Sequence, residues 1–141
     1  MRAAIAVALT IAATTARADA PLGWEVRVPE KVEVARGQVV SVPIAIALDR
    51  GITVSKDGPV LIDVAPDPGL YVRKRRLLRA DAVDPEADVP RFVIPVRGDT
   101  AGDHVVKLRI RLWLCGGKVC RPLDLKRQTI ITVASPAEPT P

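Results

Sequence analysis

The stretch HVVKLRIRLWL, residues 104–114, alternates aliphatic side chains with charged side chains and one tryptophan. One side of an extended chain carries Val106, Leu108, Ile110, Leu112 and Leu114, and the other carries Lys107, Arg109, Arg111 and Trp113. Successive side chains of a strand point to opposite faces, so this pattern is typical of a half-buried antiparallel strand. We therefore expect a β-strand with its aliphatic side toward the core.

The same alternation recurs along most of the chain. It is present in WEVRV (24–28), KVEVA (31–35), VVSVPIAIAL (39–48), VLIDVA (60–65), RFVIPV (91–96) and QTIITVA (128–134). Turn-forming Gly, Pro and Asp separate these segments, and no window after the N-terminal region has a capped helical stripe. Seven to nine short strands at this spacing predict an all-β, immunoglobulin-like antiparallel β-sandwich, with a small β-barrel as the alternative.

The N-terminal region has the form of a secretory signal. Arg2 precedes an apolar run over residues 3–13, and Ala16-Arg17-Ala18 fits the small-x-small rule for cleavage before Asp19. We expect a signal peptide over 1–18, a sandwich domain over 19–134 and a disordered Pro-rich tail over 135–141. A cut after Ala20 and an uncleaved interfacial anchor are the alternatives. No apolar run reaches the length of a membrane span.

The chain has two cysteines, Cys115 and Cys120, in the segment CGGKVC directly after the strand. The glycines at 116 and 117 permit a tight hairpin turn, which places the cysteines on opposite arms. An exported protein with an even cysteine count is expected to form disulfides. A 115–120 bond closes a very short loop and stabilises by only about 2 kcal/mol, so a redox-active pair stays open beside a structural bond.

Metal binding is disfavoured, because two thiolates supply half a tetrahedral site and His104 is the chain's only histidine. The spacing also differs from the Cys-x-x-Cys motif at a helix N-terminus. Lys118 and Arg121, with Arg111, would favour a thiolate after reduction. Trp113 falls on the same face as Cys115, where it either shields the bond or simply packs. We expect no cofactor and no metal.

The segment CGGKVCRP, between an alternating strand and a final strand, resembles the cysteine hairpin of the N-terminal periplasmic domain of the thiol:disulfide interchange protein DsbD. The similarity extends upstream over EVARGQVVSVPIAIALDRGITVSKDGPVLIDVAPDPGL and covers most of residues 25–134. It implies an immunoglobulin-like fold, a periplasmic location, Cys115 and Cys120 as a redox pair, and Pro122 as the proline two positions later.

The chain departs from that family in three ways. The segments GITVS and RRLLRADAVDPEADVPR have no aromatic residue to shield the cysteines, a single proline follows Cys120 where two are usual, and the membrane and thioredoxin-like domains are missing. We therefore expect a monomeric exchange module whose partners are periplasmic thiol-disulfide proteins or a separate membrane or thioredoxin-like reductase. The alternative is a non-enzymatic binding or assembly module with a structural disulfide.

The densest basic run is YVRKRRLLR, residues 71–79, in a chain of net charge +5. Four aromatic residues in all are too few for the stacking platforms of a single-strand nucleic-acid binder, so we expect no nucleic-acid partner and read the run as a solvated strand face. No Ser-His-Asp order, phosphate-binding loop or carboxylate pair supports a hydrolase.

Overall fold

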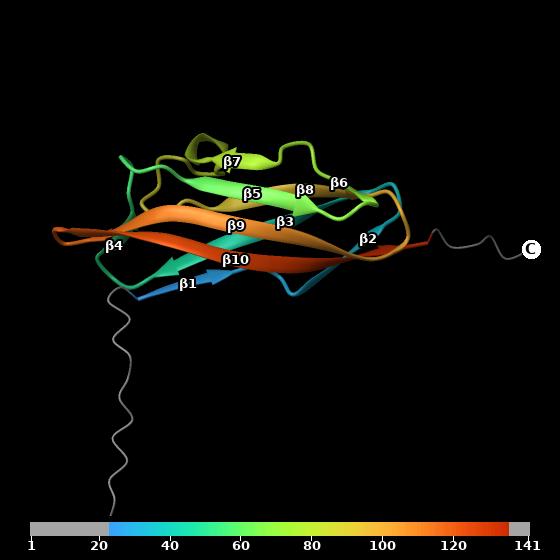
Figure 1. Ribbon diagram of the computed structural model, residues 1–141, viewed down its shortest axis with the longest axis horizontal. Coiled ribbons are helices and arrows are strands. Elements are labelled where there is room, and N and C mark those ends of the chain that lie inside the picture. The colour runs from blue at the N-terminus through green and yellow to red at the C-terminus, as the bar shows by residue number, and fades with distance from the viewer. Residues whose placement is uncertain (1–22, 136–141) are drawn as a thin grey trace, which may run out of the picture.

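The structure, a computed structural model, describes residues 23–135 and packs ten strands into two sheets (Figure 1). The expected signal peptide (1–18) and residues 136–141 of the expected tail lie outside the described residues. The strands are β1 (Trp24–Arg27), β2 (Lys31–Ala35), β3 (Val39–Leu48), β4 (Ile52–Val54), β5 (Leu61–Pro66), β6 (Leu70–Tyr71), β7 (Arg76–Leu78), β8 (Phe92–Gly98), β9 (Gly102–Gly116) and β10 (Val119–Ala134).

One sheet has the strand order β1-β3-β8-β6 and the other β2-β10-β9-β5-β7, with β4 pairing to the end of β9. In an immunoglobulin sandwich, strands A, B, E and D form one sheet and strands C, F and G form the other. Here β1, β3, β8 and β6 take the places of A, B, E and D, and β5, β9 and β10 take the places of C, F and G. The predicted immunoglobulin-like β-sandwich is therefore confirmed. One pairing departs from the antiparallel expectation, because β2 runs parallel to β10.

The first two strands explain that exception. β1 pairs with β3 in one sheet, whereas β2 crosses to the other sheet and pairs with β10. Pro29 lies between them, where a residue without an N–H and with a fixed φ ends a strand. The chain thus changes sheets within a few residues.

The aliphatic side of β9 faces the core as predicted. Val106, Leu108, Ile110, Leu112 and Leu114 are all at most 2% exposed. Lys107, Arg109 and Trp113 on the other side are exposed, and Arg111 is half-buried. We call this solvent side of β5, β9 and β10 the outer face, and it carries the disulfide.

The short strand β4 has no counterpart in the sequence prediction, and the short strands β6 and β7 take up only parts of the strand expected over 71–79. The basic run over 71–79 is also not a single strand, because β6 ends at Tyr71, β7 begins at Arg76, and the residues between them form a loop. These strands are too short to show a period of two. Residues 80–90 form the predicted loop, apart from a 3-10 turn over Arg79–Asp81.

Thr129 carries a buried hydroxyl without a partner. Its side chain is 0% exposed, and its Oγ1 makes no hydrogen bond within residues 23–135. Thr129→Val should therefore raise the free energy of unfolding by about 1 kcal/mol, since it replaces an unpaired polar group with a methyl group of similar size.

Urea unfolding measures this change. The matched control is Thr132→Val, because the Thr132 hydroxyl donates a 2.7 Å hydrogen bond to Asp103 Oδ1 and its loss should not stabilise. An unchanged or lower stability for Thr129→Val would mean that the hydroxyl is hydrogen-bonded in solution.

Candidate functional site

Cys115 and Cys120 lie directly opposite each other on β9 and β10 and form a disulfide, as the sequence predicts. Their Cα atoms are 4.1 Å apart. Gly117 supplies the left-handed backbone conformation of the turn between them, with φ +61°. The tip of this hairpin projects beyond the other strands at one end of the sandwich (Figure 1).

The two cysteines have different surroundings. Cys115 is half-buried and has a strand on each side, with Cys120 opposite it on β10 and Thr53 opposite it on β4. Cys120 is exposed. Among the described residues, β10 has only β9 as a neighbour at this end, because its pairing with β2 begins at Ile130. The sulfur of Cys120 therefore lies on the open edge of the hairpin.

Trp113 and Pro122 form the next cross-strand pair on the outer face. Trp113 is 38% exposed and packs against Gly58, where an added Cβ would lie only 3.0 Å from the indole. Both side chains line a depression of about 270 Å³ that Pro59, Leu61 and Leu123 extend toward β5. The disulfide thus has an apolar platform beside it on the same face, built from residues 58–61, Trp113 and Pro122.

Two unpaired cations flank Cys120 in sequence. Lys118 lies in the turn and Arg121 follows the cysteine, and neither forms an ion pair among residues 23–135. Positive charge near a cysteine favours its thiolate form. The role that the sequence predicts for these two residues, stabilising a thiolate at the hairpin tip, stays a prediction.

Arg111 does not share that role. Its Nη2 donates a 2.7 Å hydrogen bond to Asp63 Oδ2 on β5, and it lies four residues, about 13 Å of strand, before Cys115. Asp63 also accepts a 2.8 Å hydrogen bond from Arg76 Nε. This bond from Arg76, with the one from Arg111, lowers the pKa of the Asp63 carboxyl. The guanidinium of Arg111 thus serves the outer-face ion pairs rather than the cysteines.

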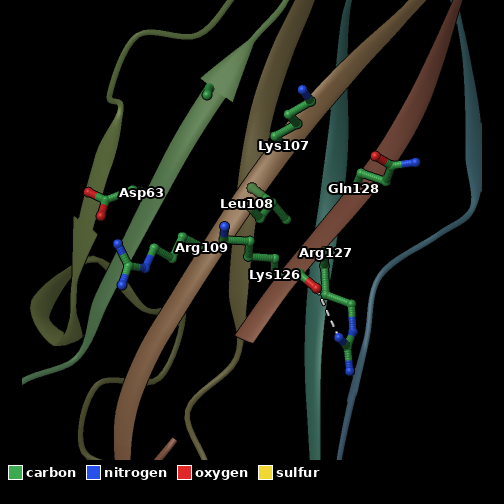
Figure 2. A pocket seen from close by; sticks show the side chains of 8 residues that line it. Asp63, Lys107, Leu108, Arg109, Lys126, Arg127 and Gln128 are labelled. Atoms are coloured by element: carbon green, nitrogen blue, oxygen red, sulfur yellow. Dashed lines mark hydrogen bonds between the residues drawn. The ribbon is translucent and has the colours of Figure 1, made fainter. Parts of the chain in front are cut away.

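A shallow groove of about 550 Å³ continues along the outer face between β5, β9 and β10 (Figure 2). Arg109 in this groove is paired with Asp124 at 2.8 Å, and the hydrogen bond from Arg109 lowers the pKa of the Asp124 carboxyl. Lys107 and Lys126 have no ion pair in the described part of the chain. Arg127, which also lines the groove, has no ion pair there either, so three cations of the groove lack a carboxylate partner.

Arg79 is a structural residue of the site that sequence reasoning did not single out. It belongs to the basic run over 71–79, yet its guanidinium is half-buried and bonded to four backbone carbonyl oxygens of β4 and the following loop. Composition offers no signal for this role, because the acceptors are backbone atoms. Its neighbours in the run, from Arg73 to Arg76, are exposed as expected.

We also searched residues 23–135 for metal ligands, membrane-spanning helices and an aromatic shield around the cysteines. No three His, Cys, Asp or Glu side chains gather there as metal ligands, and no helix there could cross a bilayer. β4 lies within the segment GITVS and flanks Cys115 with Thr53, so this side of the cysteine has a threonine and no aromatic side chain.

No family model and no curated protein matches the chain. Among solved structures, it is similar to a cohesin module from a Clostridium perfringens family 33 glycoside hydrolase, with 13% identity, a TM-score of 0.45 and coverage of 82% of this chain and 98% of that one. A PapD-like domain of human CEP192 has 10% identity, a TM-score of 0.40 and coverage of 96% and 100%. AggA, the major fimbrial subunit from Escherichia coli, has 10% identity, a TM-score of 0.35 and coverage of 81% and 95%. The immunoglobulin-like assignment rests on the strand topology itself.

Proposed function

We propose that the domain is a thiol-disulfide exchange module in which Cys115 and Cys120 alternate between disulfide and dithiol. The observation that carries the proposal is the placement of the disulfide, with Cys120 exposed on an unpaired strand edge at the hairpin tip. A bond in this position is open to an incoming thiolate and adds little to stability. The resemblance of CGGKVCRP to the cysteine hairpin of the DsbD N-terminal domain supports the same function.

The exchange proceeds in two steps. A partner thiolate attacks Cys120 Sγ, so a partner–Cys120 disulfide forms, the 115–120 bond breaks, and Cys115 leaves as a thiolate that takes up a proton. A second thiolate of the partner then attacks the partner's own sulfur and releases Cys120. Two electrons pass from the partner dithiol to this domain, and the reverse sequence passes them onward. Lys118 and Arg121 stabilise the thiolates, and Trp113 with Pro122 provides an apolar contact surface for the partner.

The partners of such a module are periplasmic thiol-disulfide proteins or a membrane or thioredoxin-like reductase on a separate polypeptide. A periplasmic location follows from the expected signal peptide over 1–18 and from the same resemblance. No cofactor enters the exchange, because both steps are displacements between sulfur atoms.

The reduction potential of the 115–120 pair tests the proposal. Equilibration with reduced and oxidised glutathione should give a value between about −200 and −270 mV, the range that the glutaredoxins and thioredoxin span. A value well below about −300 mV marks a structural bond that glutathione does not reduce. That result would contradict exchange and favour the alternative, a binding or assembly module whose disulfide only rigidifies the hairpin.

A further inference from the structure

The guanidinium of Arg79 joins two segments that are far apart in sequence. Its Nη1 lies 3.2 Å from the carbonyl oxygen of Val54 and 2.9 Å from that of Ser55, at the end of β4. Its Nε and Nη2 donate to the carbonyl oxygens of Pro85 and Ala87 in the following loop, at 2.8 and 2.7 Å. A guanidinium has five N–H donors in a planar fork, which makes it able to hold four divergent carbonyls at once.

The segment held by Arg79 is the one that flanks Cys115. Thr53 lies directly opposite Cys115, and the Ser55 N–H donates to the Trp113 carbonyl oxygen at 2.8 Å. β4 has only three residues, and a strand this short is marginal unless other contacts hold it. The covering of Cys115 on this side therefore depends on what fixes β4.

Two further contacts attach β4 to the same loop. The Val54 N–H donates to the Asp88 carbonyl oxygen at 2.9 Å, and the exposed Lys56 and Asp88 form an ion pair at 3.8 Å. The ion pair is long and solvent-accessible, and such pairs contribute little. Arg79 bridges the two segments with two hydrogen bonds to each and is half-buried, so it is the main side-chain link between them.

We propose that Arg79 is a positioning residue that holds β4 against Cys115 and thereby leaves Cys120 as the sulfur accessible to an incoming thiolate. This assignment deepens the proposed function and rests on it for its relevance to exchange. The accessibility difference itself is a property of the fold and can be measured whether or not the disulfide is exchanged in the cell.

The test compares iodoacetamide modification of the full-length protein in two reduced single-cysteine backgrounds. Cys120→Ala reports on Cys115, and Cys115→Ala reports on Cys120. Adding Arg79→Ala should accelerate modification of Cys115 by about tenfold or more and change that of Cys120 by less than about twofold, because only the covering of Cys115 opens locally. The control Arg127→Ala removes another half-buried arginine that donates to backbone carbonyls, those of Val26 and Lys126, and should alter neither rate.

Arg79→Lys provides a milder variant in case Arg79→Ala does not fold. Lysine keeps the charge and the aliphatic stem, but one ammonium group cannot reach four divergent carbonyls. Hydrogen exchange of the Val54 amide should then become about tenfold faster while core amides of β8 stay protected. Equal acceleration of both cysteines, or an unchanged Cys115 rate together with unchanged Val54 exchange, would overturn the proposal. Because neither readout depends on the reduction potential, its failure is distinguishable from failure of the exchange function.

Discussion

The variant Cys115→Ala should form a mixed disulfide with oxidised glutathione at least about tenfold faster than Cys120→Ala. In the first variant the remaining thiol is Cys120, which is exposed at an open strand edge and flanked in sequence by Lys118 and Arg121. In the second variant the remaining thiol is the half-buried Cys115, with β4 beside it. Both access and thiolate character set the rate of exchange, and both favour Cys120.

Mass spectrometry of the quenched reactions gives the two rates. Both variants lose the same disulfide, so the loss of the bond itself cannot produce the asymmetry. Circular dichroism should show the same strand content for both. Equal rates, or a faster reaction at Cys115, would contradict the assignment of Cys120 as the attacked sulfur.

Phe92→Ala should lower the free energy of unfolding by about 3–5 kcal/mol, the usual cost of deleting a buried phenylalanine. Phe92 is the only phenylalanine of the chain, is 1% exposed, and lies opposite buried Ile44 in the register of β3 and β8. Such a loss is a large fraction of the total stability of a domain of this size and should lower Tm by roughly 12–20 °C.

The neighbouring residue provides the control. Val93 is on the same strand but points to the other side and is 38% exposed, so Val93→Ala should cost less than about 1 kcal/mol. Thermal and urea unfolding of the two variants measure the difference. Similar losses for both would mean that β8 does not bury its Phe92 side in solution.

The sequence predicts the long strands well because their alternation extends over five or more residues. The bounds predicted for β2 and β3 agree with the structure, and the strand predicted over 104–114 lies within β9. Strand β10 begins earlier than predicted, because Arg121, Pro122 and Asp124 obscure the alternation before Leu125. The parallel β2–β10 pairing depends on a change of sheet after Pro29, which no local pattern specifies.

The candidate site is only partly visible in the sequence. The hairpin disulfide and the placement of Trp113 on the same face as Cys115 follow from spacing and alternation alone. The difference between the two cysteines does not, because it arises from β4, a three-residue strand, and from Arg79, whose partners are backbone oxygens. A side chain that binds backbone atoms distant in sequence produces no recognisable pattern in the amino-acid sequence.

The position of the disulfide also bears on how the chain folds. Fifteen residue pairs align β9 with β10, and a shift of one residue would turn every aliphatic side chain of one strand to solvent. A bond between Cys115 and Cys120 beside the turn excludes a hairpin with shifted register. The rest of β10 can then pair with β9 in one register only. Oxidation of this pair at the start of folding would therefore select the correct strand alignment before the two sheets meet.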